Sequence, residues 1–526
     1  MIAYKYTFLL LIPSFIHAQS IKPEWGDQII PTRNSPVLKR IVKGQPDELI
    51  AIGLRWTPNA LNLPDTYVAT RLDKDLKPVM ERDLFSTRYR DDFHDVYNFK
   101  GNVFLFTRQF NRNEKMTYYY YKQIDPATLQ TIDSNAIGHY KAINRGWQPE
   151  IKIKFSTDTS HILLFSEAAN RYPWEEPKKF YISVRDHHMH KLWEKEITLS
   201  YINKFFMIEG FEISNDGDVY VLCKHYNRQV IREGVREKGV IVPSYTYKVL
   251  IVRENDDKPR EHIVQLPNRF VHAMTLQFDN DGTIHLVGLY KEKRNGNVSG
   301  HFIAALDKNA PQTTIKKLEP FPVDDLLQLL YKDFCASINT NDPGLWDRFR
   351  IMGTNNRSDG SVDLLTEFNY SSEEREGSIL DSNRTNSTHT VYDARDILVI
   401  NYKKDGQVFY TRIPKWQSER SDALISFKWM NQGDQLLLFY LDSESNVKKD
   451  LSKRPDALFI LRSVFVVASV NDKGKLQRQM AYSHKETEFI TALNVCSVVD
   501  THTLALYTER ARVFSKSKFQ FGRLKL

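Results

Sequence analysis

The chain has 526 residues, of which 41% are hydrophobic and 12% aromatic, and its formal net charge is +8. This hydrophobic content is enough for a packed core and excludes a globally disordered chain. Because 65 acidic residues are interleaved with the 73 basic ones, the small excess of charge favours a solvated mixed-charge surface over a nucleic-acid-binding protein.

Residues 1–18 have the pattern of a secretory signal peptide. Lys5 supplies the positive start, residues 7–16 form a short apolar core, and Ala18 precedes Gln19 at the expected cleavage point. This Ala-Gln junction resembles that of many exported proteins of Bacteroidota. The apolar core is too short to span a bilayer, and no later stretch reaches the roughly 18 apolar residues needed for a transmembrane segment. We therefore expect an exported protein, either periplasmic or secreted to the cell surface.

From residue 37 onward, one unit recurs along the chain. Each unit contains a short strand, a tight polar turn and an apolar strand, followed by a variable loop and two further strands. The apolar second strands of these units begin at Ile50, Val103, Ile162, Val219, Ile284, Val362, Leu436 and Leu504. Four-stranded antiparallel units repeated in line close radially, so we predict an all-β fold, a β-propeller of eight blades. Seven blades remain the alternative if the first or last unit is degenerate.

The two ends of the chain complement one another. Residues 518–526 predict the third strand of the last unit, which leaves its fourth strand missing. Residues 25–33 precede the opening strand of the first unit, at residues 37–44. Because an open sheet edge is a liability, we expect residues 25–33 to supply the missing outer strand. Residues 19–526 would then form a single propeller domain closed by an N-terminal strand.

Several turns between first and second strands carry Asn-Asp-Gly or Ser-Asp-Gly, at residues 215–217, 280–282 and 358–360. These are signals of short hairpins. Together with the apolar strands that follow, residues 213–223 and 278–288 resemble the propellers of secreted and sensor proteins generally. The resemblance implies an architecture and no particular activity, since a fold does not specify a function.

The connections within the repeat are unequal. Turns from first to second strand and from third to fourth strand are short and lie on one face of a propeller, which we call the short-turn face. The other connections are long and lie on the opposite, loop-rich face, where ligand-binding residues are expected. The largest insertions belong to blades four to seven, at residues 227–246, 316–346, 370–395 and 442–461. They indicate a docking surface or, alternatively, surface loops that the fold tolerates and that have no binding role.

Two of these insertions carry a structural prediction of their own. Residues 323–334 have the apolar spacing of a short amphipathic helix. Residues 370–395 are polar and rich in Ser, Glu and Asn, so we expect a mobile loop.

Charged residues follow the apolar run in six of the eight second strands, five positions beyond its first core residue. They are Arg55, Arg108, Glu167, Lys224, Glu367 and Glu509. A ring of these side chains at the channel mouth would suit a sugar or a peptide, whereas the alternative is a set of structural ion pairs at strand ends. Tyr172 and Trp174 stand beside two acidic residues in a loop of the same face, a combination that suits carbohydrate. We take these eight residues as the candidate ligand site.

The sequence predicts no metal and no cofactor. His187, His188 and His190 lack Cys or acidic ligands at zinc spacing and indicate a solvated turn. The odd, widely spaced set of three cysteines is not a disulfide framework, and Cys223 and Cys496 are predicted to be small core residues. No P-loop, nucleophile elbow or zinc-protease motif is present.

These features favour binding over catalysis. The leading hypothesis is an exported, non-enzymatic propeller that binds a protein, glycan or other envelope or extracellular ligand through its loop-rich face. The alternative is a carbohydrate-active hydrolase or lyase with its site at the channel mouth.

Overall fold

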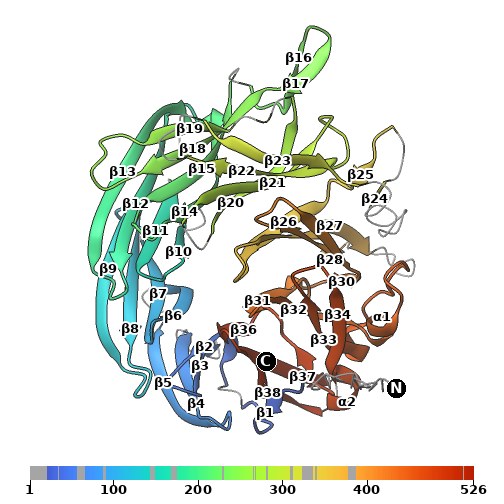
Figure 1. Cartoon of the computed structure of the whole chain (residues 1–526). Coiled ribbons are helices and arrows are strands. Elements are labelled where there is room, and N and C mark those ends of the chain that lie inside the picture. Colours follow the sequence, from blue (N-terminus) through green and yellow to red (C-terminus); the bar gives the residue numbers. More distant parts are fainter. Residues whose placement is uncertain are drawn as a thin grey trace, which may run out of the picture.

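The computed structural model describes residues 21–526, apart from 33–34, 56–64, 87–90, 143–147, 168–173, 228–229, 265, 267, 280–281, 308–311, 323–335, 338–340, 377–386 and 513–514. In these residues, consecutive antiparallel strands form eight sheets around a central axis (Figure 1). The prediction of an all-β propeller with eight four-stranded blades is confirmed.

The first four blades follow one another in chain order, each running from the inner to the outer strand. Blade one contains β2 (Val37–Lys43), β3 (Leu49–Arg55), β4 (Thr66–Leu72) and β5 (Pro78–Ser86), and blade two β6 (Asp91–Phe99), β7 (Asn102–Asn111), β8 (Met116–Ile124) and β9 (Thr131–Lys141). Blade three contains β10 (Ile151–Phe155), β11 (His161–Glu167), β12 (Pro177–Asp186) and β13 (Lys191–Ile202), and blade four β14 (Phe206–Ile213), β15 (Val219–Tyr226), β18 (Tyr245–Val252) and β19 (Arg260–Val264). A separate hairpin, β16 (Gly234–Glu237) and β17 (Val240–Pro243), projects from blade four (Figure 1).

Blades five to eight complete the ring. Blade five contains β20 (Phe270–Phe278), β21 (Ile284–Lys291), β22 (Gly300–Leu306) and β23 (Thr314–Pro320), and the short pair β24 (Ala336–Ser337) and β25 (Gly344–Leu345) follows it. Blade six contains β26 (Phe349–Asn356), β27 (Val362–Glu376), β28 (Ser387–Tyr402), β29 (Val408–Ile413) and β30 (Gln417–Glu419). Blade seven contains β31 (Lys428–Gln432), β32 (Gln435–Ser443), β33 (Ser463–Val470) and β34 (Leu476–Ser483), and blade eight β35 (Ile490–Thr491), β36 (Ser497–Asp500), β37 (Thr503–Arg512), β38 (Ser515–Lys525) and β1 (Glu24–Trp25).

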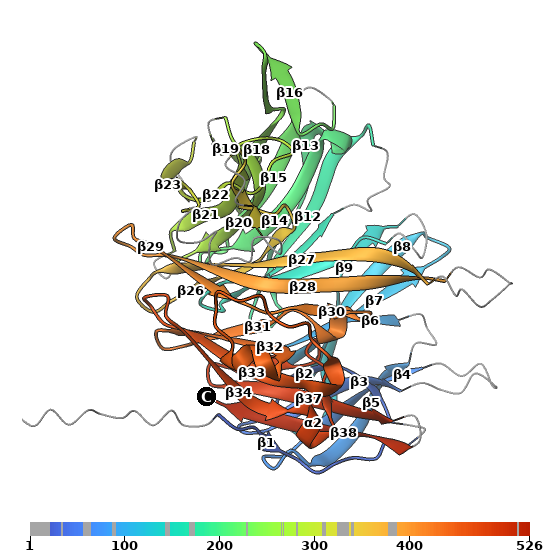
Figure 2. The same ribbon diagram turned by 90° about the vertical axis from the view of Figure 1, so that its right-hand side faces the viewer.

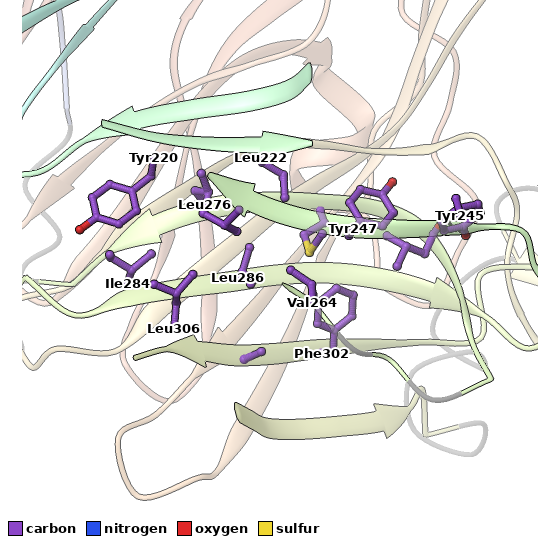
Figure 3. Close-up of a cluster of buried hydrophobic side chains, with 14 of the residues drawn as sticks. Tyr220, Leu222, Tyr245, Tyr247, Val264, Leu276, Ile284, Leu286, Phe302 and Leu306 are labelled. Carbon is purple, nitrogen blue, oxygen red and sulfur yellow. Dashed lines mark hydrogen bonds between the residues drawn. The ribbon is translucent and has the colours of Figure 1, made fainter. Parts of the chain in front are cut away.

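The hydrophobic core lies between neighbouring blades. The second strand of each blade is covered on both faces by other sheets, which explains why these strands read as continuous apolar runs. Between blades four and five, for example, Tyr220 and Leu222 of β15 pack in one cluster with Leu276 of β20, Leu286 of β21 and Phe302 of β22 (Figure 3). The predicted core positions of Cys223 and Cys496 are confirmed, since both side chains are fully buried.

The last blade takes its outer strand from the N-terminal segment. β1 pairs antiparallel with β38, with Glu24 opposite Arg523 and Trp25 opposite Gly522. The ring of Trp25 lies where a side chain at position 522 would begin, since a Cβ there would stand 2.4 Å from it. Trp25 also meets Tyr482 of blade seven edge-on at 5.1 Å, so this short strand contacts two blades.

Helices are a minor part of the described chain. The α-helices there are α1 (Glu444–Lys448) and α2 (His484–Thr487), and both lie in connections of blade seven; the 3-10 turns are η3 (Asn203–Phe205), η5 (Asp422–Leu424) and η6 (Ile460–Arg462). The predicted helix at residues 323–334 lies outside the described residues. Within the part of the chain that the structure describes, no helix has the length and apolarity needed to cross a membrane.

Candidate functional site on the loop-rich face

The most prominent feature of the loop-rich face is the long hairpin of blade six. β27 and β28 stay paired well beyond their blade, from Asn369 opposite Ala394 to Glu376 opposite Ser387, and Figure 2 shows them reaching past the neighbouring strands. The prediction of a mobile loop over residues 370–395 is therefore wrong for its described part, residues 370–376 and 387–395. Composition misled here because side chains from other connections stack with residues of these polar strands.

Arginine and aromatic side chains alternate in a stack across this face. The guanidinium of Arg348 lies 5.5 Å from the ring centre of Tyr370, and that of Arg395 lies 6.0 Å from Tyr370 and 5.3 Å from Trp416. The guanidinium of Arg454 covers the other end, 4.6 Å from Trp416. We call these five residues the ladder. Each contact is a cation–π interaction, and together they tie four separate segments of the chain into one surface.

The ladder is supported from within blade six. Asp393 accepts two hydrogen bonds of 3.2 Å from Arg395, which fixes the guanidinium plane. Arg395 also lies 5.3 Å from the ring of buried Phe368, and Trp346 packs against the same ring at 5.8 Å. The central arginine of the stack is thus held in place by blade six itself.

Beside the ladder, the insertion between β32 and β33 exposes apolar and basic side chains. Phe459 and Leu461 are 59% and 57% exposed, although residues of this type are normally covered. The exposed basic side chains of this insertion are Lys448, Lys453, Arg454 and Arg462. The result is a surface on blades six and seven that combines aromatic, apolar and basic side chains.

A layer of buried charges lies directly beneath the ladder. Lys415, the residue before Trp416, forms a 2.8 Å ion pair with Glu367, and both side chains are fully buried. Arg412 forms a second buried pair with Asp396, at 2.9 Å. Such pairs have strict geometric requirements, so they hold the loop that carries Trp416 in one position.

Blade seven adds a buried carboxyl group to this layer. Asn446 of α1 donates a 2.7 Å hydrogen bond to Asp442, and the backbone N–H of Ser443 donates one of 2.8 Å. Burial raises the pKa of Asp442 to about 7. This group therefore changes its protonation state close to neutral pH.

The residues predicted from the ends of the second strands make their ion pairs within their own blades. Arg55 pairs with Glu81 and Asp83 of β5, Glu167 pairs with Lys178 of β12 at 2.8 Å, and Glu367 pairs with Lys415. Of these three residues, Glu367 is the one that lies next to the ladder, because its partner Lys415 directly precedes the ladder residue Trp416.

Two other predicted residues of this set contact tyrosines. Arg108 of β7 is paired with Tyr119 of the neighbouring strand β8. Burial raises the pKa of Tyr119 to about 12, and the positive charge of Arg108 opposes that rise. Glu509 accepts a 2.8 Å hydrogen bond from Tyr507.

Lys224 anchors the projecting hairpin. Its ammonium donates two hydrogen bonds of 2.9 Å to Glu233, which precedes β16. The same ammonium lies 4.1 Å from the ring centre of Tyr245, with Tyr226 and Tyr247 within 6 Å. These contacts assign Lys224 a structural position at the base of β16 and β17.

The aromatic pair predicted in blade three is only partly described. Trp174 is 53% exposed, and its carbonyl accepts a 3.0 Å hydrogen bond from the backbone of Lys204. Tyr172 lies outside the described residues.

Sequence reasoning missed most of the ladder. Its members are scattered over more than a hundred residues and follow no spacing, because they meet only when four connections fold over one blade. The available signals were two of the predicted insertions, since Arg454 stands in the insertion at residues 442–461, and Tyr370 and Arg395 are the end residues of the one at 370–395.

Comparisons with known proteins bear on the fold alone. No protein-family model and no curated protein matches the chain. Among solved structures, it is similar to the WD40 domain of SCAP from fission yeast, at 8% identity and a TM-score of 0.39, over 98% of this chain and 97% of that one. It is also similar to oligogalacturonate lyase in complex with manganese, at 10% identity and a TM-score of 0.33, over 96% and 97%. A third similarity is to prolyl oligopeptidase B from Galerina marginata, at 8% identity and a TM-score of 0.40, over 93% of this chain and 55% of that one.

Proposed function

We propose that this protein is an exported, non-catalytic propeller that binds a protein or another envelope or extracellular ligand on the loop-rich face of blades six and seven. The observation that carries this proposal is the ladder, a pre-assembled stack of three arginines and two aromatic residues. Arginine, tryptophan and tyrosine are the residue types that dominate binding hot spots. Export is proposed from the signal-peptide pattern of residues 1–18.

The surroundings of the ladder support a macromolecular ligand. A protein interface has an apolar centre with polar and charged residues around it. Phe459 and Leu461 supply exposed apolar area, and the basic side chains of the same insertion surround them.

The alternative, a carbohydrate-active enzyme using the predicted acids, has weaker support. Glycoside cleavage by two carboxyl groups needs them about 5–10 Å apart across a cleft. Glu167 and Glu367 are instead held in ion pairs with Lys178 and Lys415, and the second of these pairs is fully buried. Both pairs serve the packing of a blade.

The proposal is tested by a pull-down from the envelope and extracellular fractions of the native host. The bait proteins are the wild type, the ladder variant Trp416→Ala/Arg454→Ala, and a control variant, Lys74→Ala/Lys77→Ala, in a turn of the short-turn face. We expect a discrete partner that the wild type and the control retain and the ladder variant loses. Thermal melting of each bait checks that it is folded. Equal retention by all three baits would overturn the proposal.

A further inference from the structure

A second candidate site lies in the central channel, apart from the ladder. A cavity of about 610 Å³ is lined by the inner strands of five consecutive blades, β10, β14, β20, β26 and β31. This volume is in the range of small-molecule sites. Its lining includes Lys154, Glu209, Glu212, Arg350, Gly353 and Trp429.

One wall of the cavity is a tryptophan seated on a glycine. A Cβ at Gly353 would stand 2.6 Å from Cζ2 and 2.9 Å from Cη2 of Trp429, so the indole occupies the space that any other residue would need. The register of β26 against β27 shifts between Ile351 and Gly353, which brings this backbone into place. Among the residues that the structure describes, none accepts a hydrogen bond from the Trp429 indole N–H. The wall therefore offers an aromatic surface with a donor at its edge.

The polar groups of the cavity carry both signs of charge. Lys154 donates a 2.5 Å hydrogen bond to Glu212, and Glu209 accepts one of 2.8 Å from Tyr247. Burial raises the pKa of both carboxyl groups. Arg350 is exposed to the cavity, and its guanidinium donates a 2.8 Å hydrogen bond to the carbonyl of Asp347.

These charges select the class of ligand. Lys154 and Arg350 balance Glu209 and Glu212, so neither an anion nor a cation gains from the cavity as a whole. An anion would meet two carboxyl groups, and a cation would meet an ammonium and a guanidinium. A neutral ligand rich in hydroxyl groups can use the donors and the acceptors together, and it brings no net charge that must be desolvated.

We propose that the channel cavity binds a neutral saccharide, with one pyranose ring packed against Trp429 and its hydroxyl groups hydrogen-bonded to Glu212, Lys154 and Arg350. The apolar face of a sugar ring matches an aromatic wall, and its rim of hydroxyl groups matches paired charges. This is a binding site and includes no chemical step. It is independent of the ladder and of any partner bound there.

The test begins with an array of neutral, uronate-containing and sulfated glycans, probed with the full-length mature protein. The neutral oligosaccharide that binds best is then titrated by calorimetry into the wild type, Trp429→Ala, Trp429→Phe and Glu212→Gln. Ile132→Ala is the control, because it removes an exposed apolar side chain of the outer strand β9, outside the cavity.

We expect Trp429→Ala to weaken binding by about tenfold or more, while Trp429→Phe retains part of the affinity and Ile132→Ala all of it. Glu212→Gln keeps an acceptor but disrupts the pair with Lys154, and it should weaken binding to a smaller extent. Trp429→Phe should still capture the partner that the wild type captures in the pull-down. A failure of the saccharide proposal can therefore be told apart from a failure of the proposed function. The inference is overturned if no neutral glycan binds the wild type, if only anionic glycans bind, or if a folded Trp429→Ala binds as tightly as the wild type.

Discussion

At the scale of single residues, the site depends on charges that water does not reach. The side chains of Glu367 and Lys415 are fully buried, and those of Asp396 and Arg412 are at most 2% exposed. The sequence predicts that position 367 is charged at the end of a strand, and it allows for a structural ion pair there. It cannot predict the partner, because Lys415 is 48 residues away and reaches Glu367 only through the fold of blade six.

Removing one member of the buried pair should be costly. Lys415→Met leaves Glu367 buried without a counter-charge, and we expect a loss of about 3–5 kcal/mol in the free energy of unfolding. Urea denaturation measures this loss. The control is Lys179→Met, which breaks the exposed pair with Glu196 and should cost less than about 1 kcal/mol. Equal losses in the two variants would contradict the role given to the buried pair.

The carboxyl group of Asp442 should make stability depend on pH. Its pKa rises from an ordinary value of 3.8 to about 7 on folding, so the folded state binds more protons than the unfolded state between about pH 4 and 7. Its contribution to stability is therefore lost as the pH rises through this interval. Asp442→Asn removes the titrating group, and the difference in unfolding free energy between wild type and variant should fall over the same interval. A difference that stays constant with pH would argue against this assignment.

At the scale of elements, the long hairpin shows where prediction from composition ends. The apolar second strands are readable in the sequence because both of their faces are covered, whereas the extensions of β27 and β28 are polar and are supported by contacts from other segments. Tyr370 and Arg395 of the hairpin stack with Arg348, Trp416 and Arg454, which come from three other connections. Contacts of this kind leave no periodic pattern in the sequence.

Unstacking the ladder should loosen the hairpin without unfolding the blade. Arg395→Ala removes the central rung, so backbone amides at residues 370–376 and 387–394 should exchange with deuterium faster than in the wild type. Amides of β26 and of the blade-proximal part of β28 should exchange as before. Arg348→Ala, at the end of the stack, should have a smaller effect. Unchanged exchange in Arg395→Ala would mean that the strand hydrogen bonds alone hold the hairpin.

At the scale of the whole molecule, the repeat and the two chain ends govern the architecture. The number of blades is predictable because each one contributes an apolar strand with a polar turn before it. The cavity in the channel is not predictable in the same way, because Lys154, Glu212 and Trp429 stand on inner strands of three different blades. Only ring closure brings such positions together.

Closure itself can be tested at Trp25. Its half-buried ring contacts Tyr482 and the backbone at Gly522, and Trp25→Ala should lower the free energy of unfolding by about 2–3 kcal/mol, less than for a fully buried tryptophan. Thermal or urea denaturation measures the loss. Ile30→Ala, an exposed residue near the same segment, should change the stability by less than about 0.5 kcal/mol. If both variants unfold alike, β1 adds little to the ring.

A hydrogen-exchange footprint is the decisive test of whether blades six and seven bind a partner through the loop-rich face. The wild-type protein is compared free and bound to the partner recovered from the host. We predict slower exchange at residues 370–376, 387–395, 416–420 and 448–462, with no change in the turns of the short-turn face. Protection confined to the short-turn face, or to blades one to three, would contradict the claim.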